Sequence, residues 1–265
     1  STRNASIGAF NSTYIHLVIA FFMMFSGVNF SLYYKGFKGK WHEIFHNEEL
    51  RLYLSIIMLA TVAITLNLRF SLYENTMLAL RDAFFQVNAI ITTTGYATAN
   101  FDIWPDFSKS ILFMLMFVGG SAGSTGGGIK IIRILFLFKL IRREISKIYH
   151  PRAMIPIRIG GKALSGDVNV SIASFFALYV MTFVLGTILI SLEGNGLVSS
   201  ASAVAATIGN IGPGFDFVGP TQTYANFSIP SKMLLSFLML IGRLELYTVI
   251  ALIAPGQLRE RVFQA

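Results

Sequence analysis

The chain has 265 residues, of which 54% are hydrophobic and 13% are charged, whereas soluble domains carry about 25% charged residues. This composition argues against a soluble enzyme, and the absence of Cys from the sequence excludes a disulfide framework and a thiolate metal site. The net charge of +8 suits either nucleic acid or a membrane surface, and the positions of the basic residues decide between them.

Long apolar stretches predict an all-α membrane protein. A bilayer-spanning helix needs about 20 apolar residues, and four stretches qualify: residues 14–34, 52–68, 170–192 and 232–254. Two further apolar segments, residues 78–91 and Leu197–Ile208, are only about a dozen residues long. This shorter length is typical of half-helices that enter the bilayer without crossing it.

A fifth apolar stretch, residues 110–141, contains a glycine-rich interruption. The glycines are Gly119, Gly120, Gly123, Gly126, Gly127 and Gly128. Because a continuous helix of this length would extend about 48 Å, beyond the roughly 30 Å hydrocarbon core, we expect a break inside the membrane. The break could be a flexible hinge in a pore-lining helix or a site of close helix packing. A phosphate-binding loop is disfavoured, because Ile129-Lys130-Ile131 stands where that motif requires Gly-Lys-Ser/Thr.

Basic residues give the orientation of the chain. Lys and Arg are concentrated in segments 35–51 and 130–162 and are absent from segments 92–108 and 193–231. Short loops rich in Lys and Arg lie in the cytoplasm, so the charge is an orientation signal of a multi-pass protein, and we expect no nucleic-acid partner. The basic stretch 139–162 could bind either membrane lipid headgroups or a cytosolic partner.

Each half-helix is followed by a turn that contains a glycine. The turns consist of Thr93, Thr94, Gly95 and Tyr96 in the first case, and Asn210, Ile211, Gly212 and Pro213 in the second. Non-helical backbone at membrane depth is tolerated where it is buried in protein or lines a watery cavity. Glycine permits backbone angles that let carbonyl groups face one side, and carbonyl rings can replace the hydration shell of a cation. The two turns are therefore predicted to bind ions, and ordinary external turns are the alternative.

The same turns carry a family resemblance. The motifs TTTGYA at 92–97 and GNIGPGF at 209–215 resemble the third and fourth pore loops of the Trk/Ktr/HKT superfamily of cation transporters, closest to its Trk-type potassium uptake branch. TTGYA is also similar to the TVGYG selectivity filter of potassium channels, although Ala97 replaces the second glycine, which predicts fewer ion sites.

The resemblance covers the whole chain and implies repeated helix–pore loop–helix units around one pore. Residues 1–51 would be the closing helix of a second unit and a cytoplasmic loop. Residues 52–168 would be the third unit with its glycine-rich intramembrane loop and basic linker, and residues 169–265 the fourth unit and a tail. Because the opening helix of the second unit has no counterpart and the sequence begins without Met, we expect an N-terminal truncation.

The resemblance also assigns site residues. It implies a bound potassium ion at Thr93, Thr94, Asn210 and Ile211, and a gate formed by the glycine-rich loop and Arg243. Arg243 lies within an apolar stretch, where an ion is costly and is a functional candidate by default. Glu245 is two residues further on and cannot share its helix face. The alternative is a structural pair with a carboxylate of another helix or with a carbonyl group.

Together with these observations, the resemblance implies potassium uptake across a bacterial inner membrane through a channel-like pore, with the potassium ion as ligand and no organic cofactor. An alternating-access symporter coupled to sodium or protons is the alternative, but its usual inverted repeats differ from the parallel units expected here. A pump or membrane enzyme would need a phosphate loop, a spaced carboxylate pair or a metal-ligand cluster. The sequence shows none of these motifs, so we expect a protein that is not an enzyme. The resemblance further implies a homodimer and a cytosolic nucleotide-binding regulatory subunit.

Overall fold

The computed structural model describes residues 6–150, 152 and 155–244. The predicted all-α class is confirmed, because helices dominate this part of the chain. The helices are α1 (Thr13–Ser26), α2 (Phe30–Phe37), α3 (Trp41–Phe45), α4 (Glu48–Ser71), α5 (Thr76–Ile91), α6 (Asp106–Phe117), α7 (Ile131–Tyr149), α8 (Gly166–Ser191), α9 (Leu197–Ile208) and α10 (Ile229–Leu244). A two-stranded antiparallel hairpin, β1 (Arg158–Ile159) and β2 (Lys162–Ala163), follows α7.

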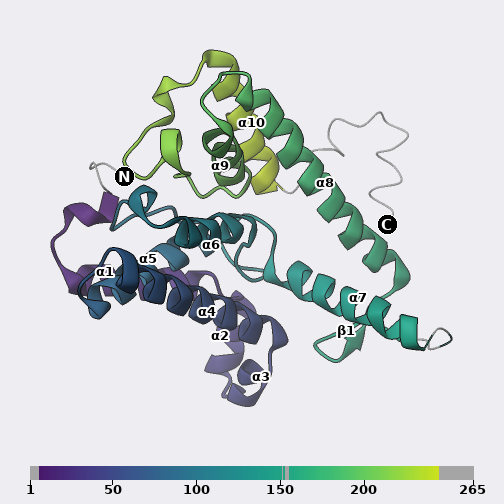
Figure 1. Ribbon diagram of the computed structural model, residues 1–265. Coiled ribbons are helices and arrows are strands. Elements are labelled where there is room, and N and C mark those ends of the chain that lie inside the picture. Colours follow the sequence, from purple (N-terminus) through teal and green to yellow (C-terminus); the bar gives the residue numbers. More distant parts are fainter. Residues whose placement is uncertain (1–5, 151, 153–154, 245–265) are drawn as a thin grey trace.

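The described residues also form four short 3-10 helices. They are η1 (Ser6–Ala9), η2 (Phe101–Ile103), η3 (Asp216–Val218) and η4 (Tyr224–Asn226). Figure 1 shows one group of helices formed by α1 to α6 and a second formed by α8 to α10, while α7 and the adjoining end of α8 project away from both.

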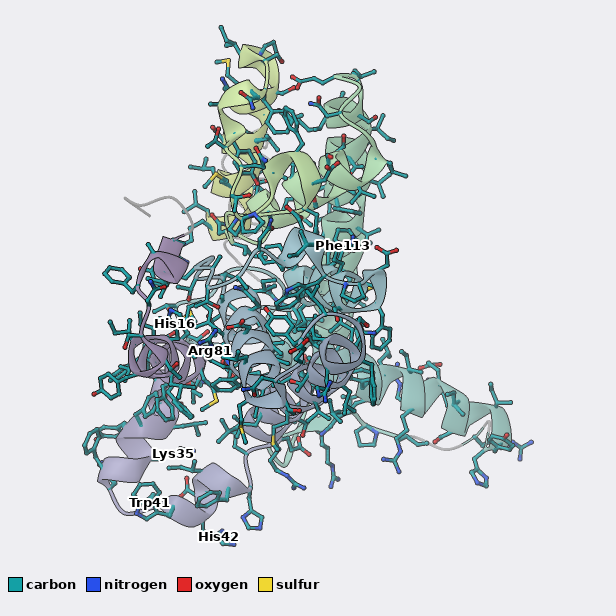
Figure 2. The ribbon with its side chains drawn as sticks, turned by 60° about the vertical axis from the view of Figure 1, so that its left-hand side comes forward. His16, Lys35, Trp41, His42, Arg81 and Phe113 are labelled. Carbon is teal, nitrogen blue, oxygen red and sulfur yellow. The ribbon has the colours of Figure 1, made fainter. Side chains whose placement is uncertain are left out.

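Both half-helices lie inside their groups. α5 packs against α1, α4 and α6, and α9 packs against α8, α10 and α6. A shared apolar core joins the two groups, since Ile211 and Phe215 cluster with buried residues of α4, α5 and α6. Phe113 lies on α6, where the two groups meet (Figure 2). The centroid of its ring is 6.4 Å from that of Phe215. The turns that follow α5 and α9 are therefore brought together by the core.

The helix lengths match several expectations. α4 and α8 are long and apolar enough to cross a membrane, which confirms the expected spans 52–68 and 170–192. α9 has the bounds expected of the second half-helix, and α5 begins earlier than residue 78 because the Asn75 side chain caps it, accepting from the N–H of Met77 at 2.8 Å. The expected span 232–254 lies partly outside the described residues.

The stretch 14–34, expected to form one spanning helix, forms two helices that only together are long and apolar enough to cross a membrane. α1 and α2 meet at a bend of 94°. Asn29 starts α2 by accepting the N–H of Ser31 at 2.9 Å, and the carbonyl of Gly27 accepts the N–H of Ser121 at 2.8 Å. Backbone groups that lack helical partners at the break thus form hydrogen bonds with the glycine-rich loop. Local hydropathy does not reveal this partner.

Candidate ion-binding turns and gating loop

The first half-helix ends in a Schellman motif. Thr93 donates its N–H to the carbonyl of Ile90 at 3.0 Å, and Thr94 donates to Ala89 at 2.9 Å. Thr93 has a φ of +56°, which is rare for a β-branched residue. Its Oγ1 accepts the N–H of Gly127 at 2.8 Å. A contact with the glycine-rich loop therefore helps to hold Thr93 in this strained conformation.

The second half-helix ends in the same way. Asn210 donates its N–H to Thr207 at 3.0 Å, and Ile211 donates to Ala206 at 2.8 Å. The φ of Asn210 is also +56°, a conformation that Asn tolerates better than most residues. The Asn210 side chain donates to the carbonyl of Met239 at 3.1 Å, which links the turn to α10. The two turns thus have matching backbone hydrogen bonds at matching positions.

The two turns lie against each other. Gly95 has a φ of +71°, and a Cβ at this position would overlap the carbonyl oxygen of Ile211 and lie 3.1 Å from Cδ of Pro213. Gly212 has a φ of +112° and open space where its Cβ would be. Its carbonyl accepts the hydroxyl of Tyr224 at 2.7 Å. Both glycines are required by their backbone angles, but only Gly95 is also required by the neighbouring turn.

A second set of contacts joins the loops that follow the turns. The rings of Phe101 and Phe215 lie 5.4 Å apart between centroids, and Asp216 donates its N–H to Oδ1 of Asp102 at 3.0 Å. Ser199 donates its hydroxyl to Oδ2 of Asp216 at 2.5 Å. Partial burial raises the pKa of Asp102 above its ordinary value; the backbone N–H of Asp216 opposes this rise, and the charge of Asp216 adds to it.

The glycine-rich loop, residues 118–130, connects α6 to α7 and lies directly against both turns. A Cβ on Gly127 would overlap the carbonyl oxygen of Gly209, the residue before the second turn. A Cβ on Gly126 would lie 3.4 Å from the carbonyl oxygen of Thr92, the residue before the first turn. Within the loop, Gly119 approaches the carbonyl of Gly127 too closely for any side chain. Close approach of backbone to backbone explains these glycines.

The remaining loop glycines serve different needs. Gly123 and Gly128 have φ values of +69° and +66°, which favour glycine. A Cβ on Gly120 would lie 3.0 Å from the carbonyl oxygen of Gly27 in the α1–α2 break. The interruption expected in the stretch 110–141 is therefore confirmed as an irregular loop held between α1, α5 and α9.

Two cations hold the carbonyl groups of this loop. Arg243, in the last described turn of α10, donates Nη1 to the carbonyl of Thr125 at 2.8 Å. Lys130 donates Nζ to the carbonyl of Gly126. Arg243 thus contacts a backbone carbonyl, in agreement with the second of its two structural alternatives, while Glu245 lies outside the described residues.

A family model described as TrkH, cation transport protein, matches residues 1–259. The chain belongs to this family.

Relatives of the TrkH family agree with the assignment. The Trk system potassium uptake protein TrkH of Salmonella typhimurium is 36% identical over 262 residues, covering 98% of this chain and 54% of the relative. TrkH of Vibrio parahaemolyticus is 37% identical over 259 residues, covering 96% of this chain and 53% of the relative. The crystal structure of the potassium transporter TrkH from Vibrio parahaemolyticus matches with a TM-score of 0.88 and 36% identity, covering 96% of this chain and 55% of that one. The chain spans about half the length of the curated relatives it matches.

Within this TrkH-family chain, the sequence-predicted residues gather in one region. The eight turn residues follow the ends of α5 and α9, the loop that holds the six glycines lies against them through Gly126 and Gly127, and Arg243 reaches the loop from α10. The side chain of Tyr96 is the most outward of the first turn, with 39% of its surface exposed.

One buried residue of this region has no distinguishing sequence pattern. Glu49 is only 6% exposed and accepts the N–H of Ala122 in the loop at 2.6 Å. In the sequence it stands beside Glu48 in the first turn of a helix, where acidic residues are common because they complement the helix dipole. The sequence pattern therefore does not show that Glu49 is buried and Glu48 is exposed.

Proposed function

We propose that this protein takes up potassium across the bacterial inner membrane through a channel-like pore. The observation that carries the proposal is the matched pair of turns after α5 and α9, which abut at Gly95 and Ile211. In the proposal, backbone carbonyls of Thr93, Thr94, Asn210 and Ile211 coordinate the ion. The carboxyl ends of both half-helices add the negative pole of their dipoles at the same place.

The turns supply only part of a ring of ligands. Two turns in van der Waals contact cannot surround a dehydrated ion, so further helix–pore loop–helix units of the whole protein complete the ring in this proposal. Such repeated units, with the ones in this chain at residues 52–168 and 169–265, follow from the family resemblance of the two pore-loop motifs.

The glycine-rich loop and Arg243 form the proposed gate. The loop lies against both turns through Gly127, and Arg243 holds the carbonyl of Thr125 at 2.8 Å. A loop at this position obstructs an ion leaving the turns, and the guanidinium adds an electrostatic barrier to a cation in a poorly screened span. Glycines make the loop movable, because their backbone has more accessible conformations.

The proposed partners bind on the cytoplasmic side. The projecting helix α7 carries Arg142, Arg143 and Lys147, of which Arg142 is exposed. Such a basic projection suits anionic membrane lipid and a cytosolic nucleotide-binding regulatory subunit. The functional assembly is a homodimer in this proposal.

The test is ion uptake into vesicles that contain the intact transporter. We expect radioactive rubidium, a potassium substitute, to enter down its own gradient and faster than radioactive sodium, because the carbonyl ligands suit the larger ion. Protein-free vesicles are the control. Uptake that requires an imposed sodium or proton gradient would support the alternating-access symporter instead, and equal rubidium and sodium rates would contradict potassium selectivity.

A further inference from the structure

Glu49 connects three segments that meet at the glycine-rich loop. Its Oε1 accepts the N–H of Ala122 at 2.6 Å. The same carboxylate interacts with the backbone of Ile132 at the start of α7 and with the side chain of Asn29 at the α1–α2 break. A hydrogen bond to a carboxylate is stronger than one between neutral groups. One buried side chain therefore fixes the loop, the helix that follows it and the broken helix beside it.

The neighbouring Glu48 is placed differently. Its side chain is 43% exposed, forms an ion pair with Lys139 and accepts the N–H of Gly160 at 3.3 Å. These contacts lie on α7 and beside the β-hairpin and do not involve the loop. Glu48 is thus a matched control for a change at Glu49, because it has the same chemistry, the same helical turn and no loop contact.

The buried Glu49 carboxylate lies beside a polar pocket. It borders a pocket of about 350 Å³ whose lining includes Lys35, His42 and Glu43. Figure 2 shows Lys35 and His42 on the projection formed by α2 and α3, away from the turns. Burial of a carboxylate is costly unless it is hydrogen-bonded, and the contacts of Glu49 to Ala122, Ile132 and Asn29 offset this cost.

The two halves of the loop have different anchors. The first half, residues 121–123, is tied to the α1–α2 break, where Ser121 donates to Gly27 at 2.8 Å and Phe30 donates to Gly123 at 3.3 Å. Glu49 adds the third hydrogen bond to this half.

The second half, residues 124–128, contacts the turns and Arg243, and its hydrogen bond to α1 is a long one, from Oγ1 of Thr125 to the carbonyl of Ser26 at 3.5 Å. The halves are coupled, because the N–H and the hydroxyl of Ser124 both donate to the carbonyl of Ser121, at 3.2 and 2.6 Å. Loss of an anchor in the first half would therefore also loosen the half that lies against the turns.

We propose that Glu49 is a positioning residue that fixes the first half of the loop and so holds the pore closed. The inference rests on the proposed function of the loop as a gate. It adds a residue on α4 to a gate otherwise formed by the loop and α10.

A cysteine reporter separates movement of the loop from ion flux. The chain contains no Cys, and Thr125 is exposed, so Thr125→Cys provides a single thiol in this chain on the second half of the loop. We expect Glu49→Ala to raise the labelling rate of this thiol by a membrane-impermeant maleimide about tenfold, the effect of losing a hydrogen bond to a charged group. Rubidium flux per folded molecule should rise several-fold.

Two further variants make the result specific. Glu49→Gln keeps an oxygen that can accept the N–H of Ala122 but loses the charge, so its labelling rate and flux should lie between parent and Glu49→Ala. Glu48→Ala should label and conduct like the parent. Glu49→Gln also serves if Glu49→Ala does not fold, because a folded Gln variant with parental labelling and flux would overturn the proposal.

A loop-shortened variant, with residues removed within 123–128, distinguishes failure of this inference from failure of the gate. Parental labelling and flux in Glu49→Ala, together with raised flux in the shortened variant, would overturn the role of Glu49 and leave the gate standing. Faster labelling in Glu49→Ala with parental flux in both variants would overturn the gate and the inference with it.

Discussion

The carbonyl oxygen of Ile211 occupies the space that a side chain on Gly95 would need. The two residues come from turns separated by more than a hundred positions in the sequence, yet they are in direct backbone contact. The reverse contact does not exist in the described structure, since a Cβ on Gly212 would meet nothing within 4 Å. The matched turns are therefore unequal in how tightly they are packed.

Substitution of the two turn glycines should reveal this inequality. Both Gly95→Ala and Gly212→Ala pay about 1 kcal/mol for a positive φ. Gly95→Ala must also displace the Ile211 carbonyl, so we expect a larger loss of folded yield and of rubidium-over-sodium selectivity than for Gly212→Ala. Uptake of both ions per folded molecule is the measurement, and equal effects of the two variants would contradict the proposed packing.

A methyl group on the loop should move it away from the turns. In Gly127→Ala the new Cβ would overlap the carbonyl of Gly209, so the loop must shift and basal rubidium flux should rise several-fold. Gly166→Ala is the control, because its Cβ would face open space at the start of α8. Flux in Gly127→Ala at or below the parental level, with normal folding, would count against an obstructing loop.

Arg243→Ala should increase cation flux. The change removes a positive charge near the turns and the hydrogen bond that holds the Thr125 carbonyl. Arg243→Lys keeps the charge but loses the planar fork that fixes its direction, so an intermediate flux is expected. Flux and folded yield should be measured together, and a stable Ala variant with parental flux at every voltage would refute the gating role.

The pH dependence of stability should report on Asp102. Its pKa is raised above the ordinary 3.8 by partial burial, so the folded state binds the proton more tightly than the unfolded state. The contribution of Asp102 to the free energy of unfolding is therefore greatest in acid and is lost as pH rises through the raised pKa. We expect Asp102→Asn to reduce the dependence of the free energy of unfolding on pH in this range.

Denaturation midpoints in detergent, measured from about pH 4 to 7, provide the test. Asp106→Asn is the control, because the Asp106 side chain is 95% exposed. Parallel profiles for the parent and Asp102→Asn would show that the burial of Asp102 has no effect on stability in this range.

Local signals were sufficient for the half-helices. The bounds of α9 agree with the prediction because Gly196 precedes it and Gly209 ends it, and its apolar run lies between them. The positive φ of Gly95 also follows from its residue type. The positive φ of Thr93 does not follow from its residue type, because β-branched residues disfavour it. The hydrogen bond from the N–H of Gly127, on the distant loop, to Oγ1 of Thr93 helps to hold this conformation.

Features that depend on distant partners could not be predicted in this way. The apolar stretch 14–34 has the length and composition of one span, and its break depends on Ser121, which satisfies the carbonyl of Gly27. The loop role of Glu49 likewise depends on the fold that brings Ala122 to it. Family resemblance supplied the roles expected for the turn residues and Arg243, which hydropathy alone does not give.

The broken helix sets a solvent requirement for any movement of the loop. If the loop leaves as the proposed gate requires, the carbonyl of Gly27 and the N–H of Phe30 lose their partners, and in the hydrocarbon region an unsatisfied backbone group costs several kcal/mol. Water must then take the place of the loop, so opening of the proposed gate and entry of water at the α1–α2 break would be a single event. Solutes too large to enter the pore would withdraw this water osmotically and so favour the closed position of the loop.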